Sequence, residues 1–541
     1  MSTETTQGPC TGYITQSYFA LEEPGKEVIA IDRKTFQRTQ FINDENNKVF
    51  HFESVIGLYV SESEKYITFL IKSEPVTTHR SIYAVKQVLI LPLTTECDSS
   101  FISLLEKGFQ DYPTYYSTCS DLTETYQQFT SPQDFEEEIP DNYSEEEDNI
   151  NNRFEYNTSK LSSLKLRDEF LWNAFPLSQF HNIFTNFSST CHLIQGSVYD
   201  NFPFITISRR SRYNAGFHTW SRGSDEYGHS ANFVEIEQLY IHSDTVYSFI
   251  QCRGSPPLHL VQVALGKMHV DDSPESLQRA RKHIHHLERL YYDSKIVVAC
   301  LTNWSGKEKP LTDVYKKAVN DLVDFRAMNF SKLMKIQNGI KDFIYEEIKD
   351  RISIGKTVNG KNINKQKYII RTNCASSTDR TNIVQALIAE YAFISIASLS
   401  IEEDEKLIDL WNVLGDELAL QYAGTKLVKK SILIDGCYSK SQNYKDNAII
   451  GWRGFKSFVD GGEQHDSLVV LTQEKPVLKI GKRNIISKSK DWLIGIIKFL
   501  LVVILSFLIN TLSKYNIKPK ILPTAIQFLS NPPQSFQTQN E

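Results

Sequence analysis

Between about residues 25 and 95, apolar and polar side chains alternate in short runs that polar turns separate. Two of these runs are SVIGLYVSESEKYITFLIKSE and RSIYAVKQVLILPL. Alternation with a period of two puts the apolar side chains on one face of a strand, so the pattern predicts an antiparallel sheet. Strands and loops are expected to continue to about residue 260.

Further along the chain, helical spacing alternates with buried strands. SPESLQRARKHIHHLERLYYD (273–293) is predicted to be a helix, and KIVVACL (295–301) a buried strand. KYIIRTN (367–373) reads as another strand, and TNIVQALIAEYAFISIASL (381–399) as the helix that follows it. With 541 residues the chain is expected to form two or three domains. The order of elements predicts a mixed fold, α+β or α/β, with a β-rich N-terminal part.

One apolar segment near the far end is long enough to cross a membrane. WLIGIIKFLLVVILSFLINTL (492–512) has 21 residues, and only Lys498 interrupts it. At this length a helix spans a hydrocarbon core of about 30 Å, so a single transmembrane helix is predicted, with a buried core helix as the alternative. Six Lys and Arg residues lie in 471–491 and three Lys in 513–520, which predicts that the body of the protein lies in the cytosol.

Composition and charge argue against three possibilities: a nucleic-acid-binding protein, a disulfide-bonded protein and a metal site. The net charge of −6 argues against a general nucleic-acid-binding protein, which usually needs a basic surface. The eight cysteines are scattered without a C-x-x-C pair, so we expect reduced thiols rather than disulfides or a zinc site. His283, His285 and His286 lack the spacing and the acidic or cysteine partners of a metal site, and we interpret their helix as solvated.

Two further segments need an interpretation. GKTVNGKN (355–362) almost fits the nucleotide-binding pattern G-x4-G-K-[ST], but Asn362 replaces the required hydroxyl and no helix follows, so we reject that reading. SPQDFEEEIPDNYSEEEDNINN (131–152) is rich in Asp and Glu and has no Lys or Arg. It is predicted to be a mobile surface loop, and a segment that binds a protein partner is the alternative.

The stretch RTNCASSTDRTN (371–382) carries the candidate chemistry. Cys374 and Arg380 lie in a predicted turn between a strand and a helix. Amides at a helix N-terminus favour an anion, and the same field lowers the pKa of a thiol. Cys374 would attack phosphorus, and Arg380 would hold two phosphate oxygens. The spacing of Cys374 and Arg380 is weak evidence alone, since chance would supply such a match in about a third of chains of this kind.

The other residues of this loop have expected roles as well. Thr381 would donate a hydrogen bond to the sulfur as it leaves. Asp379 is the local candidate for protonating the leaving alcohol, and a helix N-cap is its alternative role. The phosphate would lie against the intervening residues, which are Ala375, Ser376, Ser377 and Thr378.

The loop resembles the signature of the Sac (suppressor-of-actin) domain phosphoinositide phosphatases, which commonly reads R-T-N-C-x-D-C-L-D-R-T-N. Other stretches are similar to the family in the same order: YYSTCSDLTETYQ (115–127), DEFLWN (168–173), SRRSRYNAGFHTWSRGSDEYGHSANFVEIEQ (208–238), SFIQCRGSPPL (248–258), GDELALQYAGT (415–425) and FVDGGEQHDSL (458–468). The resemblance covers about residues 50–470.

The resemblance implies a metal-independent phosphatase without a cofactor, acting on phosphoinositide monophosphates in a bilayer, chiefly phosphatidylinositol 4-phosphate. It implies an N-terminal Sac subdomain (1–175), a catalytic domain of cysteine-phosphatase type (176–480), a basic linker (481–491), the membrane span (492–512) and a tail (513–541). The implied location is the membrane of the endoplasmic reticulum or Golgi. The cations predicted to lie near the acidic head group, with ordinary surface charge as the alternative, are Arg209, Arg210, Arg212 and Arg222.

The departures from the family pattern keep a second hypothesis open. Ser376 stands where the family has an aspartate, and Ser377 where it has a second cysteine; Asn214 and His218 replace two family cations. The alternative to an active lipid phosphatase is therefore a weak or inactive Sac domain that binds phosphoinositides or proteins. A phosphotyrosine phosphatase is a third reading, disfavoured by the matches outside the loop.

Overall fold

The computed structural model describes residues 9–42, 47–61, 64–94, 97–131, 167–263 and 267–473. Most of the predicted acidic loop (131–152), the predicted linker 481–491, the predicted span 492–512 and the tail 513–541 lie outside these residues. Within the described ranges, no helix is long and apolar enough to cross a membrane.

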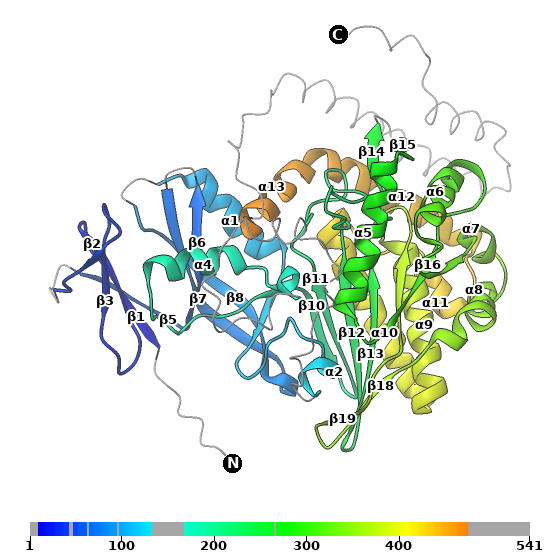
Figure 1. Cartoon of the computed structure of the whole chain (residues 1–541), viewed down its shortest axis with the longest axis horizontal. Coiled ribbons are helices and arrows are strands. Elements are labelled where there is room, and N and C mark those ends of the chain that lie inside the picture. Colours follow the sequence, from blue (N-terminus) through cyan, green and yellow to red (C-terminus); the bar gives the residue numbers. More distant parts are fainter. Residues whose placement is uncertain are drawn as a thin grey trace, which may run out of the picture.

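The chain begins with a small antiparallel sheet at one end of the molecule (Figure 1). Its strand order is β4-β3-β2-β1-β5. The strands are β1 (Cys10–Ile14), β2 (Tyr18–Glu22), β3 (Ile29–Asp32), β4 (Arg38–Thr39) and β5 (Lys48–Phe52). Phe19 and Phe52 pack from this sheet onto Phe69 of the next one, so the two sheets share a core.

A thirteen-stranded sheet runs through the rest of the molecule in the order β17-β16-β20-β13-β12-β11-β10-β9-β8-β7-β6, and β18 and β19 extend it from β13. Its first strands are β6 (Ser54–Ser61), β7 (Glu64–Thr77), β8 (Ile82–Pro92) and β9 (Thr114–Ser117). The antiparallel pairing of β6, β7 and β8 confirms the strand pattern read from 25–95. Strand β9 pairs with β10, so the sheet continues across the predicted boundary at 175/176, and that domain division stays a prediction.

The second half of the sheet changes from antiparallel to parallel pairing. Its antiparallel strands are β10 (Ile194–Asn201), β11 (Phe204–Arg210), β12 (Val234–His242) and β13 (Thr245–Arg253). Strands β20 (Tyr368–Asn373), β16 (Lys295–Cys300) and β17 (Asp324–Ala327) then follow β13 in parallel. Parallel strands end at the same edge, and the segments that follow them are thereby brought together there.

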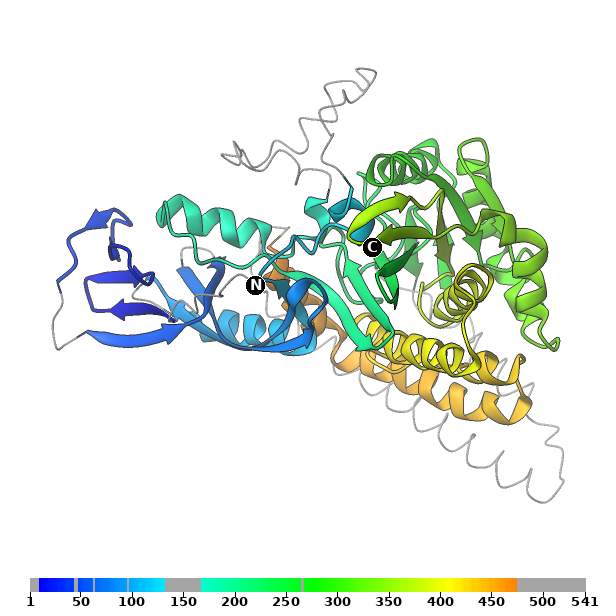
Figure 2. The ribbon, with the colours of Figure 1, turned by 90° about the horizontal axis from the view of Figure 1, so that it is seen from below.

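Helices cover both faces of the parallel strands (Figures 1 and 2). Helices α5 (Pro274–Leu290) and α6 (Lys309–Val319) pack on one face, and α9 (Asp379–Ala397) and α10 (Ile401–Ala423) on the other. Strand β16 shows why: Val298 joins the core under α5 and α6, while Val297 joins the core under α9 and α10. A strand with apolar side chains on both faces needs such a cover on each. The predicted helices and strands at 273–301 and 367–399 are therefore confirmed.

The remaining helices and short elements lie at the margins. The helices are α1 (Ser99–Asp111), α2 (Tyr126–Phe129), α4 (Ala174–Ile183), α7 (Phe330–Leu333), α8 (Gly339–Phe343), α11 (Ser431–Asp435), α12 (Lys440–Val459) and α13 (Gly461–Thr472). Short 3-10 or π turns lie at His79–Ser81, Asp168–Phe170, Gly306–Glu308, Ile344–Ile348 and Lys349–Arg351. Strands β14 (Leu260–Val263) and β15 (Lys267–Val270) form a hairpin. Helix α13 packs on α1, where Leu468 and Leu471 join the core of the N-terminal half. Gln473 closes this contact, because its side-chain amide donates to the carbonyl of Val60 at 2.7 Å and accepts from its N–H at 3.1 Å.

Two expectations concern single segments. The rejected nucleotide pattern forms the hairpin of β18 (Gly355–Val358) and β19 (Lys361–Asn364), which confirms that no helix begins there. The reading of 273–293 as a solvated helix is wrong for His283, which is buried. Arg371 donates to Nε2 of His283 at 2.9 Å, and Nδ1 lies 3.0 Å from the carbonyl oxygen of Gly228, so this ring links α5 to the strand that leads to Cys374.

Candidate active site

The loop that follows β20 is short and curled. Cys374 comes directly after the last residue of β20, and α9 begins at Asp379, so the predicted strand–loop–helix turn is confirmed. Ser377 has a φ of +48°, and its N–H donates to the carbonyl of Cys374 at 3.3 Å. This conformation folds the loop back on itself and directs the amides of Ser376 and Thr378 at the sulfur of Cys374, next to the N-terminus of α9.

Two side chains from neighbouring segments hold the loop from behind. Arg253, at the end of β13, donates to the carbonyls of Ser377 at 2.5 Å and Thr378 at 3.1 Å. Asn232 donates to the same Ser377 carbonyl at 3.2 Å. Sequence reasoning assigned no role to Arg253, although it lies within the stretch SFIQCRGSPPL that resembles the family. Its bonds to these two carbonyls fix the position of the loop.

The environment of Cys374 favours the thiolate. The side chain is only 1% exposed, and burial alone raises the pKa of its thiol. The charge of Arg380, the hydroxyl of Thr381 and the backbone amides of Thr378 and Ser376 lower that pKa by more, so the net value lies below that of an ordinary thiol. The loop therefore stabilises one negative charge at the sulfur.

The reactivity of Cys374 toward iodoacetate should report this lowered pKa. The alkylation rate should fall as the pH is lowered, because only the thiolate reacts. We expect the pH of half-maximal rate to lie below about 8.5, the usual pKa of a thiol. In an Arg380→Met variant the midpoint should move upward, because a charge that lowers the pKa is lost. Mass spectrometry of the Cys374 peptide at a series of pH values measures both midpoints; equal midpoints in the two proteins would contradict the assignment.

Arg380 is oriented before any substrate binds. Its Nη1 and Nη2 atoms donate to the two carboxylate oxygens of Glu308 at 2.9 and 2.6 Å, and Nη1 also donates to the carbonyl of Leu301 at 3.2 Å. Glu308 is held in turn by the backbone and side-chain N–H groups of Asn303. A paired guanidinium keeps one plane and one direction, which is what bidentate phosphate binding requires. Sequence reasoning missed Glu308, which lies 72 residues before its partner.

Asp379 takes part in a contact that the sequence did not predict. Arg453 of α12 donates to its two carboxylate oxygens at 2.7 and 3.1 Å, and the N–H of Val428 donates to Oδ1 at 2.9 Å. Burial raises the pKa of Asp379, but the hydrogen bonds and charge of Arg453 and the Val428 amide lower it by more, and the net pKa is below its usual value. The alternative role as N-cap is wrong, because Thr378 occupies that position and Asp379 is the first residue of α9.

The other loop residues lie close to the sulfur. The hydroxyl oxygen of Thr381 accepts from the N–H of Cys374 at 3.1 Å. The hydroxyl of Ser376 lies 3.9 Å from the sulfur of Cys374 and 2.9 Å from the hydroxyl of Thr378. Ala375 and Ser377 are buried parts of the same loop. The structure thus brings together all the residues predicted from RTNCASSTDRTN.

Three of the four predicted head-group arginines, Arg209, Arg210 and Arg212, are buried. Arg209 donates to Glu235 at 3.0 Å and to Glu237 at 2.8 Å, and all three side chains are fully buried. Arg212 pairs with Asp168. Ordinary surface charge is therefore the wrong reading for Arg209 and Arg212, and their bonds to protein groups argue against contact with a head group.

The other two candidates, Arg210 and Arg222, differ in their burial. Arg210 is also buried, and its Nη2 donates to the carbonyl of Gly216 at 2.8 Å. Its Nε and Nη1 have no hydrogen-bond partner among the residues that the structure describes. Its burial makes ordinary surface charge the wrong reading for Arg210, while a head-group role stays a prediction. Arg222 is half-buried and donates through Nε to the carbonyl of His218 at 2.8 Å. A head-group role stays a prediction for Arg222.

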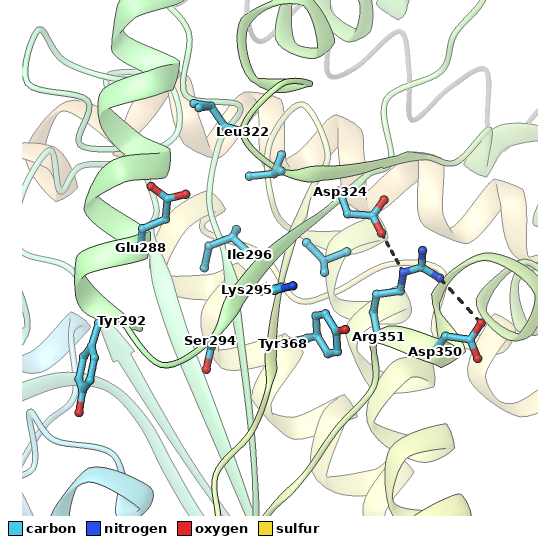
Figure 3. Close-up of a pocket in the computed structure, with 12 residues that line it drawn as sticks. Glu288, Tyr292, Ser294, Lys295, Ile296, Leu322, Asp324, Asp350, Arg351 and Tyr368 are labelled. Carbon is cyan, nitrogen blue, oxygen red and sulfur yellow. Dashed lines mark hydrogen bonds and ion pairs between the residues drawn. The ribbon is translucent and has the colours of Figure 1, made fainter.

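A cavity of about 720 Å³ lies at the opposite end of the parallel strands (Figure 3). Its lining includes Lys295, Asp324 and Tyr368, the first residues of β16, β17 and β20, while Cys374 follows the last residue of β20. Six residues of strand separate the two ends by about 20 Å. This cavity is therefore distinct from the thiolate site.

Among the residues that the structure describes, no group of His, Cys, Asp or Glu side chains is arranged to hold a metal ion.

Comparison with known proteins places this geometry in a family. A family model described as SacI homology domain matches residues 53–343, a region that ends before Cys374. Phosphatidylinositol-3-phosphatase SAC1-B of Danio rerio is 29% identical over 451 residues, which cover 76% of this chain and 72% of that relative. Phosphatidylinositide phosphatase SAC2 of Homo sapiens is 33% identical over 267 residues, 44% of this chain and 23% of the relative. Phosphoinositide phosphatase SAC8 of Arabidopsis thaliana is 27% identical over 303 residues, half of each chain.

Proposed function

Because the chain belongs to the SacI homology domain family, we propose that it is a phosphoinositide phosphatase that works through a cysteinyl-phosphate intermediate. The observation that carries the proposal is the thiol of Cys374, whose pKa is lowered by Arg380 and by the amides of its own loop. An anion site that also lowers the pKa of a nucleophile suits the attack of a thiolate on a phosphate ester.

The reaction proceeds in two displacements. In the first, the Cys374 thiolate attacks phosphorus, an S–P bond forms, and the bond from phosphorus to the inositol oxygen breaks. Arg380 and the loop amides hold the other phosphate oxygens as charge shifts between them. In the second, water attacks phosphorus and gives up a proton to solvent, the S–P bond breaks, and phosphate leaves; Thr381 stabilises the departing thiolate. The positive charge comes from Arg380, so the scheme uses no metal ion.

The leaving inositol oxygen needs a proton, and the residues of this loop are poorly suited to supply it. Asp379 was the predicted donor, but its carboxylate is paired with Arg453 and its pKa is lowered, whereas a proton donor needs a raised one. Ser376 stands where the family has an aspartate. We propose that water supplies the proton, and that the rate is correspondingly low. The same observation favours the second candidate function, a weak or inactive Sac domain that binds phosphoinositides.

A Ser376→Asp variant should release phosphate at least about 10-fold faster than the natural chain, because a carboxylic acid near the sulfur could protonate the leaving oxygen. Ser376→Asn is the matched control, since it has a similar size and no proton of suitable pKa. Steady-state phosphate release from a phosphatidylinositol monophosphate measures both variants. Equal rates for the Asp and Asn variants would show that the missing aspartate does not limit the reaction.

The substrate is proposed to be a phosphatidylinositol monophosphate in a bilayer. The family resemblance pointed to the 4-phosphate, whereas the relative from Danio rerio is named a phosphatidylinositol-3-phosphatase, so these two isomers are the first to compare. We propose a location on endoplasmic reticulum or Golgi membranes with the catalytic part in the cytosol. This location rests on the apolar segment 492–512 and its flanking lysines in the sequence.

The decisive experiment supplies the full-length protein with each phosphatidylinositol monophosphate in vesicles, with a chelator present, and measures released phosphate. Acid quenching during turnover, followed by mass spectrometry, should find phosphate on Cys374. Turnover with Cys374 phosphorylated supports the proposal and gives the preferred isomer. A folded protein that binds the vesicles but releases no phosphate would support the non-catalytic function instead.

A further inference from the structure

Three segments surround the catalytic loop at the edge where the parallel strands end. Residues 303–309 follow β16, residues 331–338 begin within α7 just after β17, and residues 426–436 include α11. We refer to these three segments together as the rim. Figure 1 shows that α6 and α7, which border the first two segments, lie at the same end of the molecule.

Hydrogen bonds join the rim segments to one another and to the loop. Asn303 donates to the hydroxyl of Ser331 at 3.0 Å, which links the first segment to the second. The N–H of Asn338 donates to the carbonyl of Gly436 at 3.0 Å, which links the second to the third. Arg380 of the catalytic loop is bonded to the first segment through Glu308. The rim is therefore a connected border around the site rather than three independent loops.

Each segment of the rim presents one large apolar side chain to solvent. Trp304 is 53% exposed, Ile336 is 47% exposed and Ile434 is 75% exposed. A single exposed apolar residue is ordinary, but three on linked segments beside the catalytic loop are not explained by packing. Tryptophan is also the side chain that concentrates at the interface between a bilayer and water.

The rim is basic although the chain is acidic. It contains seven lysines and two acidic residues, while the whole chain has a net charge of −6. The lysines are Lys307, Lys309, Lys332, Lys335, Lys426, Lys429 and Lys430. Of the two acidic residues, Glu308 is bonded to Arg380, which leaves Asp435 as the exposed one. Apolar side chains set among lysines suit a surface that is negatively charged outside and apolar within.

We propose that the rim docks on an anionic lipid bilayer. Trp304, Ile336 and Ile434 enter the interfacial layer. Lys307, Lys332 and Lys335 lie against lipid phosphates, whereas Lys309 and Lys430 are paired with Asp313 and Asp416. This inference rests on the proposed function, because it names the surface through which the lipid substrate reaches Cys374. Docking in this way places the catalytic loop over the head-group layer, so a head group enters the site while its acyl chains stay in the bilayer.

The test compares bilayer and dispersed substrates. In the full-length protein, Ile434→Asp is expected to lower phosphate release from phosphoinositide in phosphatidylserine vesicles at least about 10-fold. Its release from a short-chain, water-soluble phosphoinositide should stay within about two-fold of wild type, because Ile434 is 75% exposed on α11 and lies outside the catalytic loop. An equal loss on both substrates, or no loss on vesicles, would overturn the proposal.

Ile363→Asp is the matched control. Ile363 is 63% exposed on β19, and its hairpin pairs with the beginning of β13, at the end of the sheet away from Cys374. The same change in charge and size there should leave release from vesicles unchanged. A loss as large as that of Ile434→Asp would show that the effect is not specific to the rim.

A contact measurement keeps the inference separate from the catalytic proposal. Phosphatidylserine vesicles with brominated acyl chains should quench the fluorescence of wild type more than that of Trp304→Phe, and high salt should reduce this difference. If no phosphate is released from either substrate, the proposed function fails, but the quenching difference still supports docking. Equal quenching in the two proteins would overturn docking whatever the activity.

Discussion

A Cys374→Ser variant is expected to release phosphate at less than about one thousandth of the wild-type rate, with any phosphoinositide. The loop lowers the pKa of the Cys374 thiol and so favours the thiolate, but a serine hydroxyl starts from a far higher pKa and remains protonated. Phosphate release and acid-quench trapping on the same preparation measure the loss of both rate and intermediate.

Cys97→Ser is the control for this experiment. Cys97 is an exposed cysteine that precedes α1 in the N-terminal half, so the same replacement there should leave the rate unchanged. Circular dichroism would show that both variants are folded. If Cys374→Ser kept a substantial fraction of the activity, another residue would have to be the nucleophile, and the mechanism proposed for this loop would be wrong.

The second large effect is expected on stability. In the buried network around β11 and β12, Oε1 of Glu235 accepts from Arg167 at 2.5 Å and from Arg209 at 3.0 Å, and Oε2 accepts from Tyr291 at 2.7 Å. Glu235→Ala would leave two buried guanidinium groups without this partner. We expect a loss of about 3–5 kcal/mol in the free energy of unfolding, measured from urea titrations.

Glu402→Ala provides the comparison for Glu235→Ala. Glu402 lies in the first turn of α10 and pairs with Lys406 at 3.0 Å, with 78% of its side chain exposed. An exposed pair contributes little because water screens it and its side chains are mobile, so the loss should be below about 1 kcal/mol. Similar losses in the two variants would show that the buried network stabilises the fold no more than an exposed ion pair does.

The sequence predicted the catalytic loop well because its evidence is local. The strand before Cys374 and the helix after it are visible as short periodic runs, and the structure has both. The residues that complete the site are distant in sequence. Arg253 lies 124 residues before Ser377, and Arg453 lies 74 residues after Asp379. Only the pairing of β13 with β20 and the packing of α12 bring them to the loop, and neither contact leaves a local pattern.

The arginines of 209–212 show why the burial of a charged side chain is difficult to predict from the sequence. A charged side chain is exposed in most proteins, so a run of arginines predicts a surface or a ligand site. Arg209 is instead buried because β12 places Glu235 and Glu237 beside it on the neighbouring strand. Such a pairing depends on strand register, which one sequence does not fix. The same reason explains His283, whose burial follows from Arg371 on a strand 88 residues later.

The hydrogen bonds between Val60 and Gln473 join residues 413 positions apart, and around them α13 completes the core of the N-terminal half. Ribosomes extend a chain by about 5–20 residues per second, so on the order of 20–80 s pass between the synthesis of these two residues. During that time the surface of α1 that later receives Leu468 and Leu471 is without its cover. The N-terminal half is therefore translated first but completed last.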